Sequence, residues 1–88
     1  MRYEYDPQKL AANVKKHAVW FEEAVEFEWE TANLTIDDRN FYLETRFEAI
    51  GYIRERVYVM IFCLRVNAVR IISLRKANNR EVKRYAET

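Results

Sequence analysis

The fold is decided by VYVMIFCLR, residues 57–65, and by VRIISLR, residues 69–75, which are joined by the short connection Val66-Asn67-Ala68. The first segment opens with eight consecutive apolar residues, a pattern typical of a central strand buried on both faces of its sheet. The second is equally rich in β-branched residues. Together the two segments predict a long β-hairpin.

A third strand is expected before this hairpin, because residues 41–49 alternate with a period of two. One face of this strand would carry Phe41, Leu43, Thr45, Phe47 and Ala49. A turn at residues 53–56 would then lead into the central strand. Three consecutive strands joined in this way predict an antiparallel sheet.

The N-terminal half predicts helices. Asp6 is a typical N-cap and Pro7 suits the first turn, so a helix is expected from Pro7 to about Lys16. Apolar residues at helical spacing from Phe21 to Val25 predict a second short helix. Residues 30–40, which include Asp37-Asp38, are typical of a solvated loop.

A short strand at residues 3–5 and a last helix at residues 78–87 complete the predicted order β-α-α-β-β-β-α. This order predicts an α+β protein: an antiparallel sheet with two N-terminal helices and one C-terminal helix. With 88 residues, of which 50% are apolar and 15% aromatic, the chain has the size and composition of a single globular domain spanning residues 1–88.

Composition also limits the chemistry and the location. One His and one Cys leave almost no nitrogen or sulfur ligands, so neither a metal site nor another cofactor is expected, and a lone Cys excludes an internal disulfide. The longest apolar run has eight residues, whereas a helix needs ~20 to span a bilayer. The N-terminus lacks the apolar stretch of a secretory signal. A cytoplasmic protein without membrane contact is therefore expected.

The net charge of +1 conceals an asymmetry along the chain. Residues 1–40 carry five Lys/Arg and nine Asp/Glu, a balance of −4, and residues 41–88 carry ten Lys/Arg and five Asp/Glu, a balance of +5. This split predicts one acidic and one basic side of the molecule, although chance placement would give the same counts.

Basic residues gather near the ends of the predicted strands. Cys63 and Arg65 would share a face with Ile61, and Ser73 and Arg75 would share a face with Ile71. Lys76 and Arg80 follow where the chain enters the last helix. Guanidinium groups in such a cluster suit phosphate binding, because their planar fork matches phosphate oxygens. The alternative is that each arginine pairs with Glu44, Glu48 or Glu81 at the surface.

His17 is the one side chain that titrates near neutral pH without help from its surroundings. It follows Lys15 and Lys16 at the predicted break between the helices, where these charges would lower its pKa and an imidazole could act beside a phosphate. The alternative is a capping or packing role at a helix end. Cys63 lies in the middle of an apolar strand, where an inert thiol is expected.

Several short motifs follow one another nearly from end to end. They are Tyr3-Glu4-Tyr5-Asp6-Pro7-Gln8-Lys9, Asn13, Lys16-His17-Ala18-Val19, Phe21-Glu22-Glu23-Ala24, Glu44-Thr45-Arg46, Ile50-Gly51, Arg65, Arg70-Ile71-Ile72-Ser73-Leu74-Arg75-Lys76-Ala77, Glu81 and Tyr85. In this order and spacing, the sequence resembles BrnT toxins, the toxin half of a bacterial type II toxin–antitoxin pair with a RelE-like fold.

The resemblance implies an endoribonuclease that inhibits translation and is held inactive by a BrnA-type antitoxin. That antitoxin would carry a ribbon-helix-helix region, so the complex, expected as a heterotetramer, would reach operator DNA only through the antitoxin. The residues that carry the family's function match Lys16, Cys63 and Arg65 and, less closely, Arg75 and Arg80.

The sequence departs from the family pattern at three positions. Cys63 stands where a hydroxyl residue is usual, and Ala18 stands where a glycine is usual, which disfavours a positive φ at this turn unless the backbone is strained. Trp20 is also unusual at its position. Its ring would either stack on a base or be buried in the core.

Residues and resemblance together predict RNA cleavage by side chains alone. Arg65 and Arg75 would neutralise the charge that develops on the scissile phosphate as the adjacent 2′-hydroxyl attacks, and Lys16 or His17 would assist proton transfer. Further RNA contacts are expected from Cys63, Lys76, Arg80 and Trp20. The alternative is a non-catalytic interaction module whose basic sheet face binds an acidic protein partner.

Overall fold

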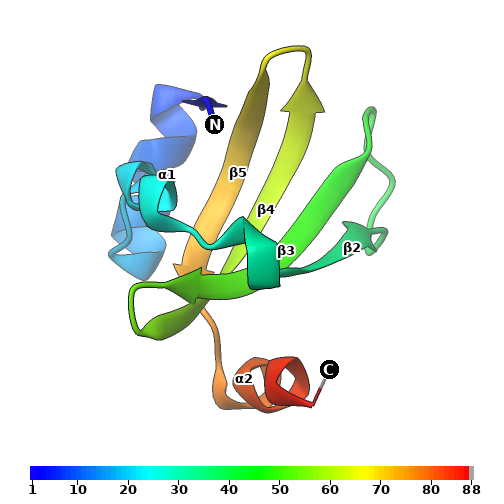
Figure 1. The fold of residues 1–88 in the computed structure, drawn as a ribbon. Coiled ribbons are helices and arrows are strands. Elements are labelled where there is room, and N and C mark those ends of the chain that lie inside the picture. The colour runs from blue at the N-terminus through cyan, green and yellow to red at the C-terminus, as the bar shows by residue number, and fades with distance from the viewer. Residues whose placement is uncertain (88) are drawn as a thin grey trace.

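The computed structural model describes residues 1–87, which form one five-stranded sheet with helices packed against it (Figure 1). The elements in chain order are β1 (Tyr3–Glu4), α1 (Pro7–His17), the 3₁₀ helices η1 (Phe21–Glu26) and η2 (Trp29–Thr31), β2 (Asn33–Asp37), β3 (Arg46–Ile53), β4 (Arg56–Arg65), β5 (Ala68–Lys76) and α2 (Asn79–Ala86). The α+β class and the central hairpin predicted from the sequence are confirmed.

The strands lie in the order β1-β5-β4-β3-β2. All neighbouring pairs are antiparallel except β1 and β5, which run parallel, so the sheet is mixed rather than purely antiparallel as expected. β4 lies at the centre and is buried along most of its length, as its apolar composition predicted. The order places β1 and β2 at opposite edges of the sheet.

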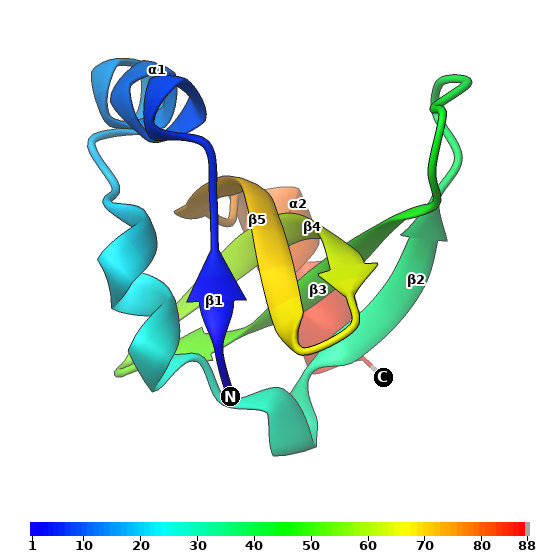
Figure 2. The same ribbon diagram turned by 90° about the horizontal axis from the view of Figure 1, so that it is seen from above.

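The sheet has one covered face and one largely open face. The covered face packs against α1, η1 and η2, which follow one another across it (Figure 2). Its core contains Phe21, Ala24, Phe27, Met60, Phe62, Ile71 and Leu74. On the other face, α2 packs only at one end of the sheet, where Tyr85 and Ala77 join Ile50, Val57 and Val59. The rest of this second face, called the open face below, carries Ile61 and Ile72 together with polar residues of the central strands.

Three elements differ from their predictions. Residues 33–37 form the edge strand β2 rather than part of a loop, because they pair with β3 along their whole length. β3 begins only at Arg46, so residues 41–45 lie in the loop that precedes it. The second helix is a 3₁₀ helix of six residues, η1, rather than a regular α-helix.

A β-bulge in β5 alters the predicted faces of the hairpin. Ile61 pairs with Ser73, but Phe62 pairs with Ile71, so Ile72 is an extra residue on β5. Such a residue breaks the simple alternation of side chains. Ile71 therefore lies in the buried core, whereas Ser73 and Arg75 are on the open face; the prediction that the three share a face is wrong.

Helix α1 is attached to the edge of the sheet by the buried Asn13. Its side-chain amide donates to the carbonyl of Leu74 at 2.7 Å and to the carbonyl of Val19 at 3.0 Å, and its oxygen accepts from the Leu74 N–H at 3.1 Å. The two bonds to Leu74 use the outer edge of β5 beyond the point where β1 ends. Asn13 thus takes the place of a neighbouring strand at this position.

Ala18 ends α1 in the left-handed conformation, with φ 58° and ψ 34°, and its N–H bonds to the Val14 carbonyl at 2.8 Å. The sequence disfavoured a positive φ at this alanine unless the backbone is strained, and the structure has this strained conformation. This conformation costs a non-glycine residue ~1–2 kcal/mol. The turn is nevertheless fixed, because the residues on either side of it, in α1 and at Val19, are anchored by Asn13.

Ala18→Gly is expected to raise the free energy of unfolding by about 0.5–1 kcal/mol, because the relief of backbone strain exceeds the entropy that glycine adds to the unfolded chain. Urea unfolding followed by circular dichroism measures the change. Ala11→Gly, at an exposed position inside the same helix, is the matched control and should lower stability by about 1 kcal/mol. Equal losses in both variants would contradict the strain at Ala18.

Candidate functional site

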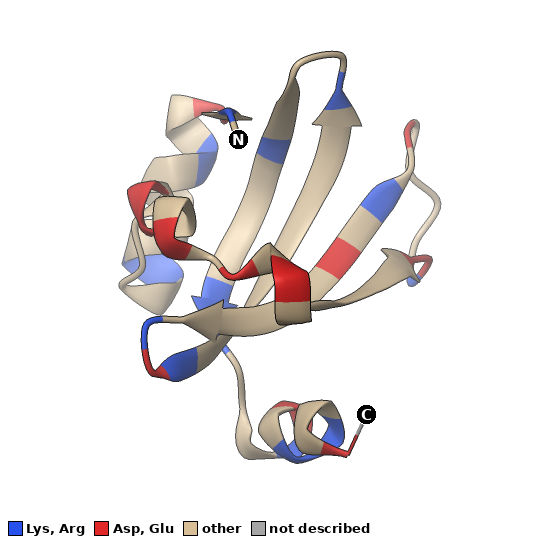
Figure 3. Ribbon diagram, viewed as in Figure 1, with Lys and Arg blue, Asp and Glu red and all other residues tan. Residues whose placement is uncertain are grey.

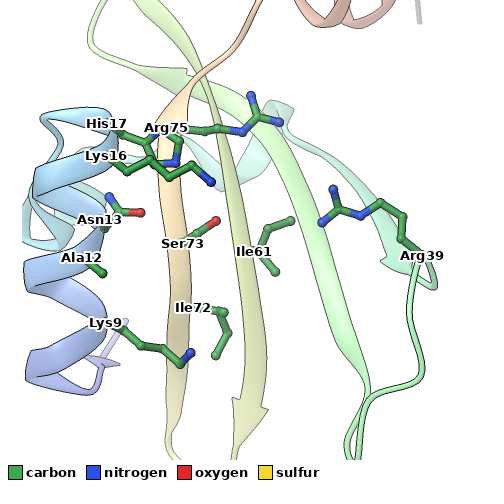
Figure 4. Close-up of a pocket in the computed structure, with 10 residues that line it drawn as sticks. All are labelled: Lys9, Ala12, Asn13, Lys16, His17, Arg39, Ile61, Ile72, Ser73 and Arg75. Carbon is green, nitrogen blue, oxygen red and sulfur yellow. The ribbon is translucent and has the colours of Figure 1, made fainter.

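A hollow of about 340 Å³ lies on the open face, between α1 and the loop that follows β2 (Figure 4). It is lined by Lys9, Ala12, Asn13, Lys16 and His17 of α1, by Arg39, by Ile61 of β4, and by Ile72, Ser73 and Arg75 of β5. Among these lining residues there are five basic side chains and no carboxylate. This arrangement suits a polyanion; we call the hollow the basic pocket.

Two independent features bring the basic side chains together. Lys9 and Lys16 are seven residues apart on α1, which is close to two helical turns, so both point to the same side of the helix. Arg75 reaches the open face because the bulge at Ile72 shifts the alternation of β5 by one residue. At one end of the basic pocket, Lys16, His17 and Arg75 gather (Figure 4).

His17 is partly buried at the end of α1. Burial lowers its pKa below the usual 6.5, and the neighbouring charges of Lys16 and Arg75 lower it further. The imidazole is therefore neutral at physiological pH and able to accept a proton. The sequence predicted both the lowered pKa and the contribution of the adjacent lysine; the contribution of Arg75 comes from the fold.

Arg75 is held by Glu81 of α2 through two parallel hydrogen bonds of 2.8 and 2.7 Å. These bonds lower the pKa of Glu81 to about 2, so its carboxylate stays ionised. The bonds to Glu81 use one N–H group on each terminal nitrogen of the guanidinium, which has five N–H groups in all. Arg75 is thus oriented by Glu81 while it keeps donors for a ligand in the basic pocket.

Arg39 forms the opposite wall of the basic pocket and is fixed by Asp37. Its guanidinium donates to both carboxylate oxygens of Asp37, at 2.8 and 3.0 Å, and Tyr42 donates to the same carboxylate at 3.3 Å. These contacts lower the pKa of Asp37, whose side chain is only 2% exposed. Asp37 is therefore a buried partner of Arg39, and the prediction of a solvated Asp37 is wrong.

Arg65 and Cys63 lie on the open face but outside the basic pocket. Arg65 pairs with Ala68 beside the hairpin turn, whereas Arg75 pairs with Val59, six residues away along β4. At ~3.3 Å per residue the two arginines are roughly 20 Å apart along the strand. The structure thus places the predicted arginine cluster at two separate positions.

At its own position, Arg65 forms two hydrogen bonds to Glu44, at 2.6 and 3.1 Å. The surface pairing considered as an alternative is therefore present for both Arg65 and Arg75. Cys63 is 1% exposed, and burial raises the pKa of its thiol, followed by the charge of Glu44. A protonated, buried thiol agrees with the inert cysteine expected from the sequence.

The remaining predicted RNA contacts are exposed but do not line the basic pocket. Trp20 is 51% exposed beside η1, so the alternative of core burial is wrong. Lys76 ends β5, and Arg80 lies in the first turn of α2. A role of these three residues in RNA binding stays a prediction.

Two basic residues of the pocket, Lys9 and Arg39, were not predicted from the sequence. Lys9 has a detectable signal, its spacing of seven residues from Lys16, whereas Arg39 has none, because only the folded loop brings it to the pocket. The predicted charge asymmetry has a location as well: acidic residues gather on η1 and η2, over the covered face (Figure 3). The basic pocket lies on the other face, but four of its five basic residues come from residues 1–40, so it is not the basic side that the charge balance of residues 41–88 predicted.

Among residues 1–87, no three His, Cys, Asp or Glu side chains are grouped so that they could hold a metal ion. No helix in the same part of the chain is both long and apolar enough to cross a membrane.

Comparison with known proteins gives one family. The model described as "Ribonuclease toxin, BrnT, of type II toxin-antitoxin system" matches residues 5–81 of the 88-residue chain. The matched range includes the whole basic pocket together with Glu81. A search of curated proteins found no match.

Proposed function

The chain belongs to the BrnT family of ribonuclease toxins of type II toxin–antitoxin systems, and from this premise we propose that the basic pocket cleaves RNA without a metal ion. The observation that carries the proposal is the group of Lys16, His17 and Arg75 at one end of a pocket lined by no carboxylate. This group combines a neutral base with two cations, which is the set of side chains that phosphodiester cleavage by an internal hydroxyl requires.

In the proposed reaction, the neutral His17 accepts the proton of a ribose 2′-hydroxyl. The 2′-oxygen forms a bond to the adjacent phosphorus, and the bond between phosphorus and the 5′-oxygen of the next nucleotide breaks. Lys16 donates a proton to the departing oxygen. The products are a 2′,3′-cyclic phosphate and a free 5′-hydroxyl, so atoms and protons balance without a further reactant.

Arg75 would stabilise the negative charge that grows on the phosphate oxygens during this attack. Its bidentate pair with Glu81 supports the role, because a guanidinium held in place loses little freedom when the transition state forms. Arg65 lies outside the basic pocket, and its predicted catalytic role stays a prediction. The reaction centre proposed here therefore consists of Lys16, His17 and Arg75.

RNA cleavage by the purified chain is expected to persist in excess EDTA, because each proposed role belongs to a side chain. Incubation of single-stranded RNA with the chain, followed by end-group analysis of the fragments, should yield 2′,3′-cyclic phosphate or its hydrolysis product and 5′-hydroxyl ends. Fragments from an untreated RNA sample are the control. Loss of cleavage in EDTA and its recovery with one divalent metal would contradict the proposal.

The family description also implies a partner antitoxin. We propose that this partner is a BrnA-type protein with a ribbon-helix-helix region and that the two form a heterotetramer. The chain would then reach operator DNA only through the antitoxin. Cleavage of cytoplasmic RNA by the free toxin would inhibit translation.

A further inference from the structure

The basic pocket extends well beyond the proposed reaction centre. Figure 4 shows Lys9 beside Ile72, at the end of the pocket opposite to His17 and Arg75. Lys9 and Lys16 are seven residues apart on α1, which corresponds to about 10 Å along the helix. This distance is larger than a single phosphate group, so the pocket has room for more than one nucleotide of a nucleic acid.

The wall of the basic pocket formed by α1 is basic and accessible to a ligand. The hydrogen bonds and ion pairs of the described residues include none for the ammonium groups of Lys9 and Lys16, which are both exposed. Between them, the small side chain of Ala12 lines the pocket. Two unpaired ammonium groups with only a small side chain between them suit the backbone of a nucleic acid, which carries regularly spaced negative charges.

The floor of the basic pocket is apolar where the walls are charged. Ile61 and Ile72 lie between α1 and Arg39 (Figure 4). Ile72 follows the buried Ile71 and joins Ile61 on the open face. An apolar floor offers a contact for the face of an unpaired base, which a base inside a duplex cannot make.

We infer that Lys9 binds a phosphate next to the reacting segment, so that the substrate is single-stranded RNA laid along α1 across several nucleotides. The inference rests on the proposed function, since it takes the His17 end of the basic pocket as the reaction centre. The base of a nucleotide between the two phosphates lies on Ile61 and Ile72. Lys9 is thus a binding residue that contributes to the capture of longer RNA and does not act on the scissile bond.

The test compares Lys9→Ala with Lys15→Ala, because Lys15 is exposed on the same helix and lies outside the basic pocket. The probe is a fluorescent single-stranded octanucleotide with 2′-fluoro groups throughout, which cannot supply the attacking hydroxyl. Fluorescence anisotropy should show binding about three- to tenfold weaker for Lys9→Ala, with a salt dependence reduced by about 0.7 in slope. Lys15→Ala should bind like the unmodified chain.

Cleavage of a dinucleotide and of an unmodified octanucleotide by Lys9→Ala and His17→Ala separates the inference from the proposed function. Lys9→Ala should slow cleavage of the octanucleotide and leave that of the dinucleotide unchanged, whereas His17→Ala should slow both. Equal binding and cleavage by Lys9→Ala and Lys15→Ala, with His17→Ala inactive, would overturn the inference alone. Unimpaired cleavage by His17→Ala would overturn the proposed function itself. Tighter binding of a duplex than of the single strand would also overturn the inference.

Discussion

His17→Ala is expected to slow RNA cleavage by about 10²–10⁴-fold while the protein stays folded. The imidazole is the proposed base, and the basic pocket offers no carboxylate that could take over its proton. Single-turnover cleavage of a labelled RNA measures the loss, and melting followed by circular dichroism checks the fold. Lys15→Ala, in the same last turn of α1 but outside the pocket, is the control and should cleave at the normal rate.

The pH dependence provides a second test of this role. Because burial, Lys16 and Arg75 lower the pKa of His17 below 6.5, more than half of the imidazole is neutral at pH 6.5. The rate for the unmodified chain should therefore change less than twofold between pH 6.5 and 7.5 and fall more steeply at lower pH, where the imidazole gains a proton. The residual activity of His17→Ala should lack this fall. A normal rate in His17→Ala would place the reaction centre elsewhere.

Asn13→Ala is expected to lower the free energy of unfolding by about 3 kcal/mol, because it leaves the N–H and carbonyl of Leu74 and the carbonyl of Val19 without their buried partner. For a domain of this size, the loss corresponds to a fall in melting temperature of roughly 12–24 °C. Thermal and urea unfolding followed by circular dichroism measure both quantities.

Asn79→Ala is the matched control for this substitution. Asn79 is exposed at the start of α2, where an alanine is tolerated, and the change should stay within about 0.5 kcal/mol. Because Asn13 joins α1 to β5, it also sets the position of Lys16 and His17 relative to Arg75. Equal stability of the two variants would show that the edge of β5 is satisfied without Asn13.

The sequence predicted those elements whose pattern is strong in itself. The apolar run in β4 and the capped start of α1 at Pro7 needed no knowledge of their neighbours. β2 was missed because Asn33–Asp37 has only five residues and is bounded by Asn and Asp, which are typical of loops, although Leu34, Thr35 and Ile36 between them suit the strand that pairs with β3. The left-handed Ala18 was disfavoured for a related reason, since contacts between residues distant in the sequence hold the turn in place.

The candidate site was likewise predicted only in part, because local patterns indicate some of its residues and contacts between distant segments bring in the others. Lys16 and His17 are adjacent in the chain, so their proximity is independent of the fold. The approach of Arg75 to His17, and its separation from Arg65, depend on the register of β4 and β5 and on the bulge between them. Arg39 comes to the basic pocket through a loop whose shape is fixed by the buried Asp37, and no local pattern indicates that shape.

Because of the bulge at Ile72, the side chains that β5 presents on the open face depend on the number of residues in the strand as well as on their identity. Without the bulge, the same residues of β5 would alternate regularly beyond Ile71, which would turn Leu74 toward solvent and direct the guanidinium of Arg75 into the core beside Met60. Deletion of Ile72 would remove the extra residue and leave Ser73, Leu74 and Arg75 opposite the same residues of β4. A residue inserted beyond the bulge would instead exchange inside and outside for the segment that follows it, unless a second bulge formed. β5 is therefore expected to tolerate the loss of Ile72 better than an insertion, and the position of Arg75 at the basic pocket depends on the length of this strand as well as on its side chains.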